Sequence, residues 1–229
     1  MSKLLIISFF FIFISAKEFY NYKRYNLSEF EPLIKDKSYF LIDTRDYSKI
    51  LKGIIPNTIA ISLKVRYNYT MNSLIEKTDK IILISEKRKY KNSLLLTEKL
   101  GYTNIMGYFF IEEWTKDLNQ INEIKLNETN LKNMNKEFQL IDIREEEEHK
   151  KHGSIKNTIN VPFSTIKNNL KNINKSKINY IMDTRGYKSA ILITVLLREG
   201  YDKNKLFNVK GGYYRLNLMK NKPKKKEDL

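Results

Sequence analysis

The chain has 229 residues, of which 41% are hydrophobic, so it can fold around a core although 30% of its residues are charged. It contains no cysteine, which excludes disulfide bonds and any reaction that needs a thiolate nucleophile. The net charge of +16 would suit a polyanion. However, the lysines are scattered and no base-reading or base-stacking motif accompanies them, so we expect weak contact with anionic membranes rather than nucleic-acid binding.

The first 16 residues have the composition of a secretory signal peptide. A basic start, Met1-Ser2-Lys3, precedes an apolar run over residues 4–14 and the small residues Ser15 and Ala16. The run is shorter than the roughly 20 residues that span a bilayer. We therefore expect export, which makes the protein periplasmic or secreted. The alternative is an uncleaved N-terminal segment that anchors the protein to the membrane.

Residues 17–118 are expected to form a first domain in which short helices alternate with apolar strands. A short helix capped by Asn26 or Ser28 opens it, and the apolar runs that follow are bounded by turn residues. The predicted strands are 39–42, 58–63, 80–84 and 105–106, and the predicted helices are 27–34, 47–51, 93–100 and 111–118.

The second half repeats this order after a polar segment, residues 119–136, that we interpret as an interdomain linker. Residues 137–220 form the second predicted domain, and 221–229 are a charged, basic tail. Alternating strands and helices predict a parallel sheet covered on both faces, with ligands at the carboxyl ends of the strands. The predicted strands are 138–141, 158–161, 178–182 and 206–209, and the predicted helices are 145–151, 189–198 and 213–219.

The two halves also share motifs. In each, an apolar strand ends in Asp-x-Arg, at Asp43 and Arg45 and again at Asp142 and Arg144, and a Gly-x-Ile turn follows at residues 53 and 153. A repeat about a hundred residues apart indicates a duplicated domain rather than a solenoid unit. We expect these Asp and Arg side chains to pair with the backbone or with each other.

The segment after strand 178–182 is the most informative loop. Gly186 lets the loop close, so that backbone N–H groups of the loop and of the following helix converge on one point. Such a cradle suits an oxyanion or a thiolate. The loop and the start of its helix comprise Asp183, Thr184, Arg185, Gly186, Tyr187, Lys188 and Ser189.

These motifs, in this order and found twice, resemble the rhodanese (sulfurtransferase) family, in tandem as in the two-domain thiosulfate and mercaptopyruvate sulfurtransferases. The resemblance covers about residues 30–216 and implies an α/β fold of two rhodanese-like domains, each a small parallel sheet with helices on both faces. It also implies a cysteine that opens the loop, takes sulfane sulfur as a persulfide and passes it to a thiophile. In this chain Asp183 stands at that position.

A carboxylate cannot form a persulfide, so we expect no sulfur transfer and no catalytic residue in the usual sense. Asp183 is expected instead to accept N–H bonds from the loop and to cap the following helix. Arg185 and Lys188 stay candidate ligand-binding residues because their cationic side chains flank the cradle.

The corresponding loop of the first domain is degenerate. Either Ser85 or Ile84 occupies the cysteine position, no glycine follows, and Phe109-Phe110 replace the pair Gly211-Gly212 of the second domain. This loop is strongly basic, so it is a further candidate for binding an anion or an acidic partner, although a solvated loop explains the charges equally well. Its candidate residues are Lys87, Arg88 and Lys89.

The two histidines, His149 and His152, could share one helical face, but flanking lysines favour a solvated helix, and we expect neither a metal nor a cofactor. The leading hypothesis is an exported pseudoenzyme that acts as a binding or regulatory module for an unknown protein or a small anion. An alternative is a cysteine-independent hydrolytic or phosphoryl-directed enzyme that uses Asp183, Arg185 and Lys188. A third possibility is a purely structural surface protein.

Overall fold

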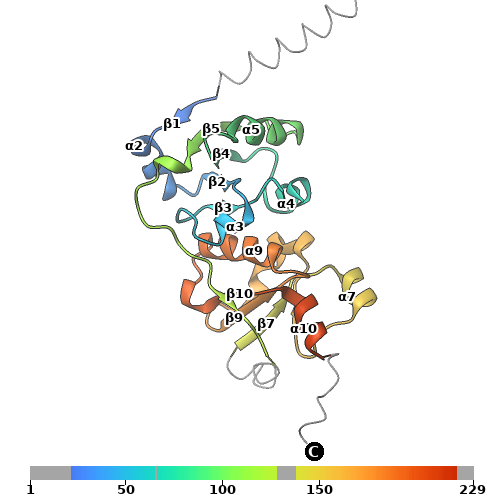
Figure 1. Cartoon of the computed structure of the whole chain (residues 1–229). Helices are drawn as coiled ribbons and strands as arrows, with labels where there is room; N and C mark the ends of the chain where they lie inside the picture. Colours follow the sequence, from blue (N-terminus) through green and yellow to red (C-terminus); the bar gives the residue numbers. More distant parts are fainter. Residues whose placement is uncertain (1–21, 65, 128–137, 221–229) are drawn as a thin grey trace, which may run out of the picture.

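The structure, a computed structural model, describes residues 22–64, 66–127 and 138–220 (Figure 1). The predicted signal peptide, the second half of the predicted linker (residues 128–136) and the basic tail lie outside the described residues. Among the helices within the described ranges, none is long and apolar enough to span a bilayer.

The first domain is built on a five-stranded parallel sheet with the order β1-β5-β4-β2-β3. Its strands are β1 (Arg24–Tyr25), β2 (Tyr39–Asp43), β3 (Ile59–Ala60), β4 (Lys80–Ser85) and β5 (Ile105–Phe110). Its helices are α2 (Leu27–Phe30), α3 (Tyr47–Ile50), α4 (Tyr67–Leu74) and α5 (Tyr90–Lys99), with 3-10 turns at Glu31–Ile34 and Ile111–Glu113.

The second domain has the same strand order, β6-β10-β9-β7-β8, and its pairs are also parallel. The fold class that the repeat predicted is therefore confirmed. Its strands are β6 (Glu123–Ile124), β7 (Phe138–Asp142), β8 (Ile159–Asn160), β9 (Ile178–Met182) and β10 (Leu206–Val209). Its helices are α7 (Glu146–His152), α8 (Ile166–Asn169), α9 (Tyr187–Arg198) and α10 (Gly212–Lys220), with 3-10 turns at Phe163–Thr165, Leu170–Asn172 and Lys203–Lys205.

The central strands are continuous apolar runs because both of their faces are covered. In β4, every residue from Ile81 to Ser85 is buried. One face of the first sheet packs on a cluster around Phe30 and Phe109, whose rings stack with centroids 4.1 Å apart. The other face contributes to a larger cluster that continues into the second domain.

Several sequence predictions need correction. The predicted helix at 111–118 is only the 3-10 turn Ile111–Glu113, because Trp114 is extended and packs, with Leu118, against the Phe30 cluster. The strand predicted at 58–63 is limited to β3, and the helix predicted at 27–34 becomes 3-10 after Phe30. Asn26 caps α2 by accepting the Glu29 N–H, while Glu29 bonds back to the Asn26 N–H.

Part of the predicted linker is built into the second domain. Glu123 and Ile124 form β6, an edge strand paired with β10, and Leu126 is buried in the core of that domain. Ile121 is 5% exposed and belongs to the cluster shared by both domains. Apolar side chains spaced along a polar segment therefore fasten it to the fold. The domain limits at 118 and 137 stay predictions.

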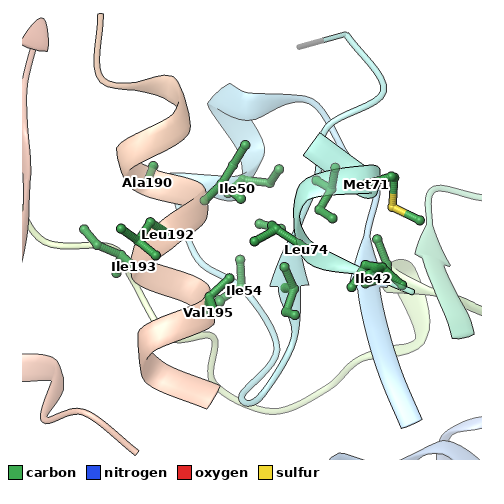
Figure 2. Packing of buried hydrophobic residues seen from close by; sticks show 14 of the residues in the cluster. Ile42, Ile50, Ile54, Met71, Leu74, Ala190, Leu192, Ile193 and Val195 are labelled. Atoms are coloured by element: carbon green, nitrogen blue, oxygen red, sulfur yellow. The ribbon is translucent and has the colours of Figure 1, made fainter. Parts of the chain in front are cut away.

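Helix α9 joins the two domains. Ten of its twelve residues are buried, whereas only Ser93, Leu94 and Thr97 are buried in the corresponding α5. Figure 2 shows Val195 of α9 beside Ile54 of the first domain, within the buried cluster that also contains Ala190, Ile50 and Leu74. A helix that is apolar on all sides needs neighbours on all sides, and here the first domain supplies them.

Polar groups of α9 form hydrogen bonds across this interface. The Thr194 hydroxyl accepts a 3.0 Å hydrogen bond from the Ala60 N–H in β3. Near the end of the helix, the Arg198 guanidinium donates to three carbonyl oxygens of the first domain, those of Lys37, Tyr39 and Asn57, at 2.9, 2.8 and 3.3 Å. Buried hydrogen bonds of this kind fix one relative orientation of the domains.

Candidate functional site

The site loop begins where β9 ends, at the carboxyl edge of the second sheet. Asp183 follows Met182 directly and its residue is 3% exposed. Gly186 has φ +96°, a value that favours glycine, and turns the chain into α9. The loop predicted from the sequence is therefore present, with Asp183 at its base.

The Asp183 carboxylate occupies the cradle itself. One carboxylate oxygen accepts a hydrogen bond from the Gly186 N–H, and the other accepts from the Lys188 N–H at 3.0 Å. The Ser189 hydroxyl lies 3.2 Å from the same carboxylate and 2.6 Å from the Asn208 side-chain oxygen. Burial raises the pKa of Asp183 above its ordinary value, although the two N–H bonds oppose the shift. The N–H groups that would bind a thiolate or an oxyanion are thus already hydrogen-bonded to the Asp183 carboxylate.

The glycine pair of the second domain supports the loop from behind. The Tyr213 N–H donates to the Asp183 carbonyl at 2.8 Å, and the Tyr214 N–H donates to the Thr184 carbonyl at 3.0 Å. A Cβ placed on Gly212 would lie 2.3 Å from the Asp183 carbonyl oxygen. Only glycine allows the two backbones to approach so closely.

Tyr47 of the first domain supports the loop from the other side. Its hydroxyl donates to the Gly186 carbonyl at 2.6 Å and accepts a 3.3 Å bond from the Asn208 amide. Its ring also meets the Tyr187 ring edge to face, with centroids 4.5 Å apart. Tyr47 was not predicted as a site residue, since no local signal in the sequence marks a contact made 139 positions away.

The pocket in front of the site loop measures about 350 Å³. Its lining combines residues of both domains: Arg66, Glu148, Asp183, Thr184, Arg185, Tyr187 and Lys188. The structure thus brings the predicted residues Arg185 and Lys188 together and adds Arg66 and Glu148, which the sequence analysis missed. Arg66 had no signal because its segment matched no expected element.

The three cationic side chains of this pocket differ in their burial and in their ion pairs. The Lys188 ammonium is largely buried, 3.8 Å from the Glu148 carboxylate and 5.6 and 5.8 Å from the ring centroids of Tyr69 and Phe163. Arg66 and Arg185 are exposed, and within the described part of the chain neither forms an ion pair. They are therefore available to a ligand.

Besides Asp183, the lining of this pocket contains one acidic residue, Glu148. Burial raises its pKa, but hydrogen bonds from the Thr184 hydroxyl at 2.7 Å and the Glu145 N–H at 3.2 Å outweigh burial and hold the pKa below its usual value. Glu148 is consequently ionised at neutral pH and faces Lys188.

The first domain has lost the equivalent site. Asp43 pairs with Ile84 as Asp142 pairs with Met182, so Ser85, and not Ile84, is the counterpart of Asp183. Ser85 is 1% exposed, and its hydroxyl lies 3.1 Å from the Ser93 hydroxyl. A buried hydroxyl whose neighbour is another hydroxyl has no general base to activate it.

The same register corrects the position of the missing glycine pair. Ser85 pairs with Phe110, which makes Ile111 and Glu112 the counterparts of Gly211 and Gly212 instead of Phe109-Phe110. The Glu112 carboxylate accepts a 3.1 Å bond from the Lys87 N–H, so an acidic side chain lies against the loop where the second domain has glycine.

One of the three candidate residues in the basic loop of the first domain is neutralised by carboxylates. The Lys89 ammonium pairs with the Asp46 and Glu86 carboxylates at 3.0 and 3.1 Å. Lys87 and Arg88 have exposed side chains, but neither they nor Lys89 line the pocket that holds Arg185 and Lys188. The structure therefore does not unite the two predicted groups of ligand-binding residues.

The repeated Asp-x-Arg motif forms two nearly identical buried ion pairs. Arg45 Nη2 lies 2.6 Å from Asp43 Oδ2 and donates to the Gly53 carbonyl at 2.8 Å. In the second domain the corresponding distances, from Arg144 to Asp142 and to the carbonyl of residue 153, are 2.7 and 3.0 Å. Each pair ties a strand end to the following turn.

The two histidines have different surroundings. His149 Nε2 lies 3.0 Å from the Asp142 carboxylate, whereas the His152 carbonyl accepts a hydrogen bond from the Tyr213 hydroxyl. No group of three or more His, Asp or Glu residues is arranged to hold a metal ion in residues 22–64, 66–127 and 138–220.

Comparison with known proteins places this geometry in context. Residues 127–217 match the sequence family of the rhodanese-like domain. A rhodanese-related protein from Thermoplasma volcanium is 26% identical over 43% of this chain and 94% of its own, with a TM-score of 0.36. No curated protein shows significant sequence similarity to the chain.

Two further structures match a larger share of this chain at lower identity. SseA from Escherichia coli, described as a 3-mercaptopyruvate sulfotransferase, is 12% identical over 85% of this chain and 100% of its own, with a TM-score of 0.34. Wild-type EanB is 12% identical over 86% of this chain and 61% of its own, with a TM-score of 0.40. Residues 127–217 thus match the rhodanese-like domain, and the sheet of the first domain has the same strand order as the sheet of the second.

Proposed function

We propose that this chain is an exported rhodanese-like protein that does not transfer sulfur and acts by binding. The observation that carries the proposal is the Asp183 carboxylate, which accepts the N–H bonds of Gly186 and Lys188. A side chain that cannot form a persulfide fills the position of the sulfur acceptor and uses its donors. The loop is kept as a rigid surface rather than as a reactive one.

The pocket beside this loop supports a small anion, or an acidic segment of a partner protein, as the ligand. Arg66, Arg185 and Lys188 supply three positive charges, while Glu148 is engaged by Lys188 and Thr184. Two of the three cations are exposed at the rim, where guanidinium groups bind carboxylate or phosphate oxygens in a forked geometry.

The enzymatic alternative, with Asp183 as a nucleophile or base, gains no support from the geometry. Both oxygens of its carboxylate accept backbone hydrogen bonds, and the residue is 3% exposed. An attacking carboxylate would have to leave these partners before it could reach a substrate.

Two measurements test the proposal. Incubating the purified chain with thiosulfate and cyanide should yield no thiocyanate above the uncatalysed rate; formation of thiocyanate would refute the loss of sulfur transfer. N-terminal sequencing of the protein recovered from secreting cells should show cleavage after Ala16, and an intact Met1 would contradict cleavage.

A binding experiment tests the pocket. We expect inorganic phosphate and a polyglutamate peptide to bind the wild-type chain in isothermal titration calorimetry, with the affinity falling as salt is added. The double change Arg66→Gln and Arg185→Gln should weaken binding by roughly 10-fold or more, as expected for two charge-assisted contacts. Arg88→Gln, an exposed arginine outside the pocket, is the matched control. Equal losses in both variants would indicate attraction to the overall charge alone.

A further inference from the structure

A second pocket lies between the two domains at the far end of α9. Residues Val195, Arg198 and Glu199 at the end of this helix line it, whereas the site-loop pocket is lined by Tyr187 and Lys188 at the start. Arg198 lies eleven positions after Tyr187 along this helix, a rise of about 16 Å at 1.5 Å per residue. The two pockets are therefore separate.

The size and the walls of this interdomain pocket suit a small organic molecule. Its volume is about 420 Å³, within the range of ligand pockets in proteins, which favour domain interfaces and apolar linings. Both domains contribute to the apolar wall, which consists of Phe40, Ile59, Leu74, Ile166, Leu170 and Val195.

The positive charges at this pocket are already engaged. The Lys167 ammonium pairs with the Glu76 carboxylate across the domain interface at 2.6 Å. The Arg198 guanidinium donates to three carbonyl oxygens and lies 4.8 Å from the Phe40 ring centroid. Neither cation is free to bind an anionic ligand.

The negative charges are less completely matched. Asp79 accepts one hydrogen bond, from the Glu76 N–H at 2.7 Å, and the Glu199 side chain is exposed with no hydrogen bond or ion pair within the described ranges, although both carboxylates interact electrostatically with Arg198. Both residues line the pocket, and the carbonyl end of α9 adds the negative end of a helix dipole. The lining contains three carboxylates, Glu76, Asp79 and Glu199, and two cations, Lys167 and Arg198, so it carries a net charge of −1 in a chain whose net charge is +16, which favours a cation.

We propose that the interdomain pocket binds a small organic cation with an apolar body, of the arylalkylamine class. The apolar body packs against Ile166, Leu170 and Val195, and the ammonium group lies toward Glu199 and Asp79. This site is independent of the anion pocket at the Asp183 loop.

Three probes that share a phenyl ring and differ in charge test the assignment: phenethylamine, 3-phenylpropionate and L-phenylalanine. Ligand-observed NMR and calorimetry on the whole chain should show that phenethylamine binds and that 3-phenylpropionate does not. Tighter binding of either carboxylate-bearing probe would overturn the proposal, since it would mean that Arg198 or Lys167 recognises the ligand. Absence of binding by all three would overturn it as well.

Variants locate the bound amine. Glu199→Gln should weaken phenethylamine binding by roughly 2- to 5-fold, the effect of one exposed charge pair, and Glu147→Gln, an exposed acid on α7, should leave it unchanged. Leu170→Trp should abolish binding by filling the pocket, with circular dichroism as the check on folding. If Leu170→Trp does not fold, Glu199→Gln and its control decide alone; equal affinities in wild type and Glu199→Gln refute the site.

The anion pocket supplies the remaining control. Arg185→Gln should leave phenethylamine binding unchanged, because Arg185 does not line the interdomain pocket. Conversely, Glu199→Gln should leave phosphate binding at the site loop unchanged. Failure of one proposal is therefore distinguishable from failure of the other.

Discussion

The hydroxyl of Tyr47 in the first domain donates a 2.6 Å hydrogen bond to the carbonyl of Gly186, in the site loop of the second. The first domain has no cradle of its own, yet it supplies the residue that fastens the cradle of the other. This relationship gives the degenerate copy a structural role: it covers α9 and positions the loop at its start.

Tyr47→Phe should therefore loosen the loop without disturbing the core. The change removes one half-buried hydroxyl and leaves the Gly186 carbonyl without that donor, so we expect a loss of roughly 1 kcal/mol in the free energy of unfolding. Urea denaturation measures the loss, and hydrogen exchange should become faster in the N–H groups at the start of α9. Unchanged exchange in Tyr47→Phe would mean that the bond does not hold the loop.

Asp183→Cys should create a reactive thiol. The sulfur would lie near the N–H groups of Gly186 and Lys188, at the start of a helix and beside the Lys188 side chain, and these features lower a thiol pKa below about 8.5. The pH dependence of alkylation by iodoacetamide gives that pKa directly.

Ser85→Cys is the matched control for this experiment, because Ser85 has the equivalent position in the first domain but lies among hydroxyl groups and is 1% exposed. Its thiol would have hydroxyl neighbours instead of the N–H groups of Gly186 and Lys188 and would not line the site-loop pocket, so alkylation should be slower by about 10-fold or more than in Asp183→Cys. Similar rates in the two variants would show that the second-domain cradle gives no special environment.

The repeated motifs predicted both sheets because buried parallel strands are continuous apolar runs, which stand out in a polar sequence. The edge strands β1 and β6 were missed, since two residues are too few for a pattern. Helix α4 was missed although its buried residues, Tyr67, Thr70, Met71 and Leu74, have helical spacing, because Tyr67 and Thr70 do not stand out as apolar core positions in the sequence. The helix predicted at 111–118 was wrong because its apolar residues serve a tertiary cluster.

Only the site residues that lie close together in the sequence could be predicted. Asp183, Arg185, Gly186 and Lys188 follow one another in a single loop, so the sequence identified them together. The contribution of Arg66 and Tyr47 depends on how two domains pack, and no spacing in the sequence encodes that packing. The basic loop at Lys87 looked free in the sequence, whereas acidic side chains distant along the chain neutralise part of it.

The pH dependence of stability should reveal the state of Asp183. Burial raises its pKa in the folded state above the value of about 3.9 for an unfolded chain, so the folded state binds the proton more tightly. The contribution of this group is then greatest in acid, below the unfolded pKa, and is lost as pH rises through the raised folded pKa.

Asp183→Asn lacks this titration and serves as the reference. The stability of the wild type relative to Asp183→Asn, measured by urea denaturation between about pH 3 and 7, should decrease as pH rises. An advantage of the wild type that grows with pH would show the opposite, namely that the two backbone N–H bonds prevail over burial and hold the carboxylate ionised.

Gly212→Ala should be among the most damaging small substitutions in the second domain. The new methyl group would lie 2.3 Å from the Asp183 carbonyl oxygen and 2.7 Å from the Arg185 nitrogen, both backbone atoms that cannot rotate away. Residue 212 also has φ +56°, so the cost of backbone strain is added to the cost of the steric clash. We expect the free energy of unfolding to fall by more than roughly 2 kcal/mol. Gly200→Ala separates the two causes, since Gly200 has φ +79° with no atom within 4 Å of the added Cβ. That control should lose only about 1 kcal/mol. Thermal denaturation of both variants measures the difference, and equal losses would show that the backbone of the Asp183 loop can move aside.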